Sequence, residues 1–128
     1  MNPTRRILIA DDDPEVRFGA VELLDGFGLS IVQAERGDEA WDLARTSEAL
    51  DLALLDLQMP GYGGLELFEL LRGEFPDLPC ILWSGAASEA IEKSALRSGV
   101  SAFLHKPVRP AVLRDEVRRL LDPPLQAG

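Results

Sequence analysis

The sequence is poor in the residues that build disulfide frameworks and histidine sites. Among 128 residues there is one cysteine, Cys80, and one histidine, His105. A single cysteine cannot form an internal disulfide, and its place in an apolar run fits a buried thiol in a reducing compartment. A lone histidine is more often a solvent-facing residue than a phosphohistidine or a metal ligand.

Positive charge and long apolar runs are also scarce. The chain has 13 lysines and arginines against 22 aspartates and glutamates, a net charge of −9. Such a surface repels phosphate backbones and anionic lipids, so we expect no direct binding to nucleic acid or membranes. No run approaches the roughly 18 apolar residues of a membrane helix, and residues 7–10 are too few for a signal peptide. We therefore expect a cytoplasmic protein.

What remains is an ordinary globular composition, with 46% hydrophobic and 27% charged residues. The length suits one domain with a single core. We expect this domain to cover residues 1–122. Pro123 and Pro124 should end the last helix, so that residues 123–128 form a tail or the start of a linker.

One stretch, residues 52–64, organises the rest. Its short apolar run is stopped by Pro60 and several glycines, which predicts a strand covered on both faces. Asp56 comes where this strand should end, because a charge inside a buried strand would be costly. The ends of parallel strands form the ligand crevice of open α/β sheets. The alternative is that Asp56 only caps a loop, since aspartate favours turns.

Similar apolar runs alternate with helical patterns along the chain. We predict strands at residues 5–10, 29–34, 52–56, 80–83 and 102–104, with a helix after each. Asp13 and Pro14 suit the start of the first helix, and Gly26 or Gly28 its end. Ser88 should cap the fourth helix, with Ile91 on its buried face. This alternation predicts an α/β fold with a parallel sheet and helices on both faces.

Polar residues collect just after the predicted strands. They are Asp11, Asp12, Asp56, Ser84 and Lys106. Because the carboxyl ends of parallel strands share one edge of the sheet, these side chains should meet. Two carboxylates about 4 Å apart repel by about 4 kcal/mol at an effective dielectric constant near 20, so three of them require a cation. Oxygen ligands with room for water suit Mg²⁺.

A metal ion, a lysine and a hydroxyl around a free carboxylate suit phosphoryl transfer onto that carboxylate. Such transfer depends mainly on positioning and on neutralising charged oxygens. A carboxylate nucleophile gives an acyl phosphate. The set therefore predicts phosphorylation of Asp56.

Four motifs in this order resemble the response-regulator receiver domains of two-component signalling, among them the chemotaxis receivers. They are Ile-Leu-Ile-Ala-Asp-Asp-Asp-Pro at residues 7–14, Leu-Leu-Asp-Leu-Gln-Met-Pro-Gly at 54–61, Ile-Leu-Trp-Ser-Gly at 81–85 and His-Lys-Pro at 105–107. The resemblance covers about residues 5–121. It implies a doubly wound, five-stranded parallel sheet with the strand order 2-1-3-4-5.

The resemblance also implies roles for individual residues. Asp56 would accept the phosphoryl group from a phosphohistidine of a sensor histidine kinase or phosphotransfer protein. Asp12, Asp56 and the backbone carbonyl of Gln58 would ligate Mg²⁺, and Asp11 would bind it through water. The phosphoryl oxygens would be bound by Lys106, the Ser84 hydroxyl and the backbone N–H of Gly85.

In the same family the fifth strand carries a switch residue, which is often tyrosine. Here that residue is Phe103. The resemblance implies that Ser84 and Phe103 together reshape the surface of the fourth helix, fifth strand and fifth helix. The chain is then no enzyme in the usual sense, because it catalyses only its own phosphorylation and dephosphorylation.

Two other functions compete with this one. An aspartyl-phosphate phosphohydrolase typically needs a second carboxylate two residues after its nucleophile, whereas Gln58 stands there and cannot donate a carboxyl proton. A degenerate receiver that only binds partners would lack part of the acidic set. The cognate kinase, the signal and the output are not encoded in any motif.

Overall fold

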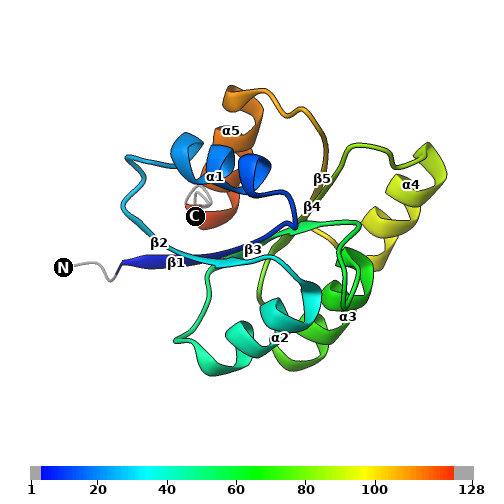
Figure 1. The fold of residues 1–128 in the computed structure, drawn as a ribbon, viewed down its shortest axis with the longest axis horizontal. Helices are drawn as coiled ribbons and strands as arrows, with labels where there is room; N and C mark the ends of the chain where they lie inside the picture. The colour runs from blue at the N-terminus through cyan, green and yellow to red at the C-terminus, as the bar shows by residue number, and fades with distance from the viewer. Residues whose placement is uncertain (1–3, 123–128) are drawn as a thin grey trace, which may run out of the picture.

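A computed structural model describes residues 4–122, in which strands and helices alternate (Figure 1). The strands are β1 (Arg5–Ala10), β2 (Leu29–Ala34), β3 (Leu52–Asp56), β4 (Cys80–Ser84) and β5 (Ala102–His105). The helices are α1 (Pro14–Leu23), α2 (Gly37–Thr46), α3 (Gly64–Glu74), α4 (Glu89–Ser98) and α5 (Pro110–Leu121). The strands form one parallel sheet in the order β2-β1-β3-β4-β5. The predicted fold class and strand order are confirmed.

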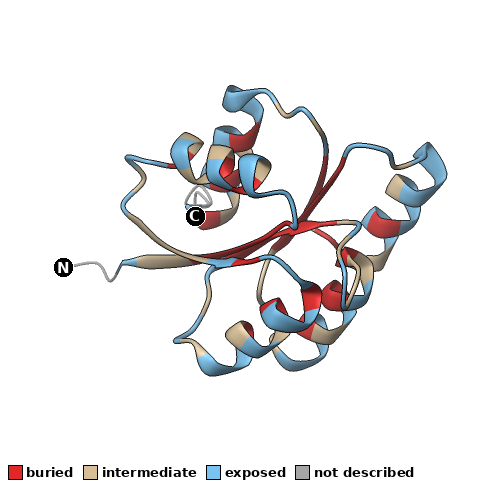
Figure 2. Ribbon diagram, viewed as in Figure 1, coloured by how far each residue is buried: buried red, intermediate tan, exposed pale blue. Residues whose placement is uncertain are grey.

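The sheet is the buried middle layer (Figure 2). All residues of β3 and β4 are buried, as expected for strands covered on both faces. Alternate side chains point to opposite faces, so Leu55 joins the core under α2, α3 and α4, while Leu54 joins the core under α1 and α5. Cys80 is buried as predicted, and burial raises the pKa of its thiol to about 12.

Helix ends follow the predicted local signals in several places. The Asp13 carboxylate accepts a hydrogen bond from the Glu15 N–H at 2.9 Å and caps α1. The Ser88 hydroxyl caps α4 by accepting from the Ile91 N–H at 3.2 Å. Gly99 ends α4 with φ of +110°, a conformation that costs glycine little.

Two local predictions are wrong. The C-cap of α1 is Leu24, and Gly26 and Gly28 lie in the turn beyond it. Their φ angles of +93° and +71° show that the turn, not the helix end, requires glycine here. Ile91 is 40% exposed, because α4 buries only Ala95 against the core.

Val108 lies before α5, which begins at Pro110, and packs against the same core as that helix. Pro123 and Pro124 fall outside the described residues. Within residues 4–122 no helix is long and apolar enough to cross a membrane.

Candidate functional site

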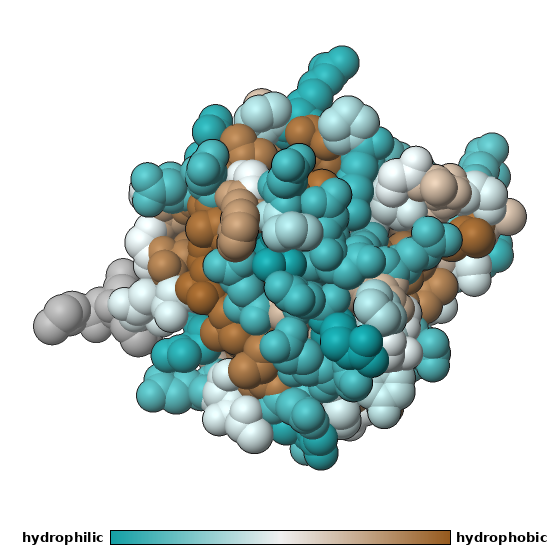
Figure 3. Space-filling model, viewed as in Figure 1, coloured by the Kyte–Doolittle hydropathy of each residue, from teal (hydrophilic) through white to brown (hydrophobic). Residues whose placement is uncertain are grey.

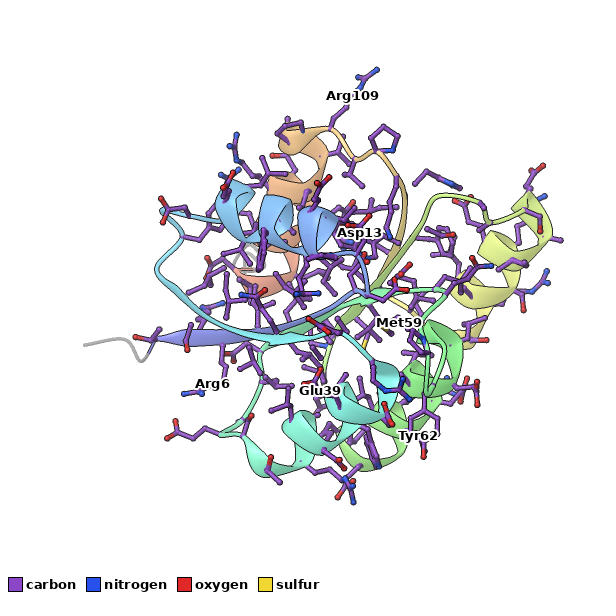
Figure 4. The ribbon with its side chains drawn as sticks, in the orientation of Figure 1. Arg6, Asp13, Glu39, Met59, Tyr62 and Arg109 are labelled. Atoms are coloured by element: carbon purple, nitrogen blue, oxygen red, sulfur yellow. The ribbon has the colours of Figure 1, made fainter. Side chains whose placement is uncertain are left out.

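The carboxyl ends of β1, β3, β4 and β5 bring the predicted polar residues together. Ala10 pairs with Leu55, so Asp11 and Asp56 follow at the ends of adjacent strands. On the other side, Asp56 pairs with Trp83, and Ser84 pairs with His105 just before Lys106. Figure 4 labels Asp13 in the loop between β1 and α1 and Met59 in the loop between β3 and α3, both beside this sheet edge.

Three carboxylates form an acidic cluster at this edge. Asp11, Asp12 and Asp56 each offer an oxygen, and these three atoms lie within 4.8 Å of one another. Asp11 is fully buried and Asp56 is 6% exposed, whereas Asp12 faces solvent. An all-oxygen donor set with one open side is what Mg²⁺ prefers, because Mg²⁺ keeps several of its waters. The residues present therefore fit this ion.

Lys106 links the two buried carboxylates. Its Nζ lies 2.8 Å from Asp11 Oδ2 and 3.1 Å from Asp56 Oδ1. Burial alone would lower the pKa of Lys106, but the hydrogen bond and charge of Asp11, together with Asp56, outweigh it and raise that pKa. Lys106 therefore stays charged and offsets part of the repulsion between the acids.

Asp56 is an unusually weak acid for an aspartate. Burial, followed by the negative charge of Asp11, raises its pKa from 3.8 to about 6. Lys106 and the Gln58 N–H, which lies 3.5 Å from Asp56 Oδ1, oppose this rise. The ionised form of Asp56 is thus held at a cost, which an added cation would remove.

The backbone around the carboxylates is tightly fixed. A Cβ added to Gly64 would lie 2.4 Å from the Asp56 backbone oxygen, so only glycine lets α3 begin so close to the end of β3. Asp11 Oδ1 accepts a hydrogen bond from the Asp13 N–H at 2.9 Å. Asp11 therefore also holds the loop that leads into α1.

Ser84 and Gly85 border the cluster at the end of β4. The Ser84 side chain is buried, and its Oγ accepts a hydrogen bond from the Ala86 N–H at 3.2 Å. Its own hydrogen remains available to donate to a ligand. Gly85 is exposed, with the Lys106 Cβ at 4.0 Å from the position of an added Cβ.

A buried arginine behind the acidic cluster was not predicted from the sequence. Arg17 donates to the Asp11 backbone oxygen at 2.7 Å, to Gln33 Oε1 at 3.0 Å and to Glu35 Oε1 at 3.3 Å. It is only 5% exposed. Arg17 falls three residues before Ala20 and seven before Leu24, which places it on the buried stripe of α1. That spacing was the available signal.

Phe103 and His105 lie at the far side of the site. Phe103 is buried, and its ring centroid is 5.3 Å from that of His105. His105 is exposed, as expected, and its Nε2 lies 2.6 Å from Glu92 Oε1 on α4. The side chains of four arginines near or on α5 are exposed, and that of Arg109 extends away from the fold in Figure 4; the other three are Arg114, Arg118 and Arg119.

Comparison with known proteins places this geometry in a family. The model of the response regulator receiver domain matches residues 7–118. A chemotaxis protein CheY homolog of Campylobacter jejuni is 32% identical over 119 residues, which cover 91% of this chain and 92% of that protein. The C4-dicarboxylate transport transcriptional regulatory protein DctD of Pseudomonas aeruginosa is 33% identical over 117 residues, but this chain spans only 25% of it.

A solved structure agrees with the sequence relatives. The CheY-like receiver domain protein of Methanospirillum hungatei superposes with a TM-score of 0.86 at 30% identity, covering 94% of this chain and 95% of that one. Sequence motifs, strand order and family match point to the same conclusion. This chain belongs to the response regulator receiver domains of two-component signalling.

Proposed function

We propose that this receiver accepts a phosphoryl group on Asp56 from a phosphohistidine of a sensor kinase or phosphotransfer protein. The observation that carries this proposal is the position of Lys106, which bridges buried Asp11 and Asp56 beside a third carboxylate, Asp12. Three carboxylates around one lysine suit a divalent cation, and with that cation bound the site would offer the positive partners that a phosphoryl anion needs.

The transfer itself needs little from the protein beyond position and charge. An Asp56 oxygen attacks phosphorus, so that a P–O bond forms as the P–N bond to the donor histidine breaks. Bound Mg²⁺ would supply positive charge to the phosphoryl oxygens and to the acids. Asp11, Asp12, Asp56 and the Gln58 backbone carbonyl are the groups that would hold it.

The other site residues receive the phosphoryl oxygens. Lys106 turns its ammonium from the carboxylates to the new anion. The Ser84 hydroxyl and the Gly85 backbone N–H donate further hydrogen bonds. Water later hydrolyses the acyl phosphate in the same pocket, which releases inorganic phosphate and restores Asp56. The only acyl phosphate that this chain would hydrolyse is therefore its own.

We propose that phosphorylation changes the surface formed by α4, β5 and α5. Ser84 moves towards the phosphoryl group and Phe103 occupies the space that Ser84 vacates. Phosphorylation shifts the equilibrium between the two arrangements of Ser84 and Phe103 only as far as the phosphoryl group interacts more favourably with one of them. Ile91 and Leu96 on α4 are 40% and 45% exposed, and an apolar patch lies over α4 in Figure 3. Such exposed side chains suit contact with a protein partner.

The partners are proposed to be proteins. A kinase or phosphotransfer protein supplies the phosphoryl group, and an effector reads the α4 surface. The net charge of −9 opposes direct contact with nucleic acid. The acting unit is proposed to span residues 1–122.

Intact mass tests the proposal. The protein is incubated with acetyl phosphate, with and without Mg²⁺, beside Asp56→Asn and the surface control Asp42→Asn. We expect a mass gain of one phosphoryl group that requires Mg²⁺, is lost in Asp56→Asn and is kept in Asp42→Asn. Continuous release of phosphate without a mass gain would indicate a phosphohydrolase instead. Neither mass gain nor release would indicate a receiver that only binds partners.

A further inference from the structure

Lys106 has a third neighbour besides the two carboxylates. Its Nζ lies 5.1 Å from the centre of the Trp83 ring, within the range of a cation–π contact. Trp83 pairs with Asp56 on one side and with Leu104 on the other, so the indole is built into the sheet next to the site. It is 3% exposed and therefore fixed in place.

The indole is not held there by hydrogen bonding. Within residues 4–122, Trp83 Nε1 is buried and has no hydrogen-bond partner. An unpaired buried N–H is costly, and phenylalanine would avoid the cost. Trp83 packs into the core under α1 and α5, but one side of the ring borders a solvent-open pocket of about 340 Å³, lined by Val16, Leu23 and Val108 among others. Packing alone therefore does not demand an indole there. What tryptophan offers over phenylalanine is a stronger π face for a cation.

Such a face matters once the carboxylates are occupied. A divalent cation held by Asp11, Asp12 and Asp56 would compete with Lys106 for these carboxylates and would repel its ammonium. The ring carries no charge and is no ligand for Mg²⁺, so its contact with Lys106 survives. Lys106 then stays beside the place where the phosphoryl group arrives.

We propose that Trp83 is a positioning residue that holds the Lys106 ammonium through a cation–π contact when Mg²⁺ fills the acidic cluster. This inference rests on the proposed phosphoacceptor function. It predicts that the affinity for a phosphoryl mimic depends on the π density of Trp83, while the affinity for Mg²⁺ alone does not.

The chain supplies a matched control. Trp41, the only other tryptophan, carries Arg45 over its ring at 4.7 Å, but both belong to α2 and neither belongs to the site. Trp41→Phe therefore leaves Trp83 as the single tryptophan, and Trp83→Phe does the reverse. The same chemical change can thus be made at either ring.

The experiment replaces tryptophan by a series with one, two and three ring fluorines, which weakens the π face with little change in shape. In the Trp41→Phe protein, calorimetry measures binding of beryllofluoride at saturating Mg²⁺ and, separately, binding of Mg²⁺ alone. We expect the beryllofluoride affinity to fall stepwise, by about threefold to thirtyfold over the series, as befits a contact of cation–π strength. The Mg²⁺ affinity should stay within about twofold, and fluorination of Trp41 in the Trp83→Phe protein should change neither.

The other outcomes decide against the inference. An unchanged beryllofluoride affinity across the series would overturn the role of Trp83 and leave the proposed function intact. A parallel loss of Mg²⁺ affinity would mean that the ring only shapes the whole pocket. If even the unfluorinated protein with Mg²⁺ failed to bind beryllofluoride, the phosphoacceptor function itself would fall. As a second check, Trp83→Phe should retain more affinity than Trp83→Leu, with folding monitored by thermal melts.

Discussion

Helices α1 and α4 both follow strands that deliver site residues, yet they attach to the fold in different ways. Helix α1 is capped by Asp13 and tied down by buried Arg17, which bonds to the Asp11 carbonyl and to two side chains near the end of β2. Helix α4 buries only Ala95 and exposes Ile91 and Leu96. Helix α1 is therefore held by a buried polar side chain, whereas α4 is held by one small buried residue and by surface contacts, among them Glu92 with His105 and Arg72 with the Ser98 carbonyl.

Removal of Asp56, the proposed phosphoacceptor, should have the largest effect. We expect Asp56→Asn to abolish phosphorylation, because an amide is a poor nucleophile, while α1 and α4 keep their places. Intact mass after treatment with acetyl phosphate and Mg²⁺ measures the loss. Phosphate found on another residue at the wild-type yield would contradict the assignment of Asp56.

Arg17→Met should have the second-largest effect, because it removes the three hydrogen bonds through which Arg17 ties α1 to the ends of β1 and β2. It leaves the Asp11 carbonyl without its buried donor, and we expect a loss of about 2 to 4 kcal/mol in the free energy of unfolding. Chemical denaturation measures it. The control is Arg109→Met, which removes an exposed arginine at the start of α5 and should change stability by less than about 0.5 kcal/mol. Equal effects of the two changes would show that α1 does not depend on these hydrogen bonds.

The pH dependence of the free energy of unfolding tests the raised pKa of Asp56. The pKa of Asp56 is about 6 in the folded protein, above the ordinary 3.8 of an unfolded chain. Between these values the folded state holds a proton that the unfolded state has lost, so stability falls as pH rises from about 4 to about 6. Asp56→Asn has no carboxyl group at this position and does not lose this stability. Without Mg²⁺ it should therefore gain about 1 to 2 kcal/mol over wild type across this range, a figure reduced for partial screening by water.

The measurement is a set of denaturation curves of both proteins at pH 4, 5, 6 and 7. Groups that do not interact with Asp56 contribute equally to both proteins and cancel in the difference. Mg²⁺ should shrink the difference at pH 7, since it favours the ionised form in wild type only. A difference that stays constant from pH 4 to 7 would rule out the raised pKa.

The buried sheet is the part of the molecule that sequence patterns predict best. Buried strands are short unbroken apolar runs, and a polar residue at the end of such a run marks the edge of the sheet, which is how Asp56 and Lys106 were identified. The contact of Lys106 with two carboxylates was not predictable, because the sequence pattern matched the lysine to a phosphoryl anion. Its Nζ instead lies between Asp11 and Asp56, since these acids repel each other without it.

The errors have a common physical origin. Arg17 was overlooked because arginine is usually exposed, and only tertiary partners make its burial favourable. Ile91 was placed inside because its spacing matches a helical stripe, but spacing gives the direction of a side chain and not how closely the helix approaches the sheet. Helix α4 lies against the sheet through a small alanine, so its larger apolar residues remain near water.

The smallest expected effect concerns this loosely held helix. Ile91→Ser replaces an exposed isoleucine three residues after the Ser88 cap, and the new side chain loses little apolar contact. We expect the free energy of unfolding to change by less than about 0.5 kcal/mol, the usual range for surface positions. Hydrogen exchange on the unmodified protein tests the same comparison. The amides of α4 should exchange faster than those of α1, because the hydrogen bonds of Arg17 must break before α1 opens. A large loss of stability in Ile91→Ser, or protection of α4 equal to that of α1, would mean that α4 is held as firmly as α1 and would contradict the difference between the two helices.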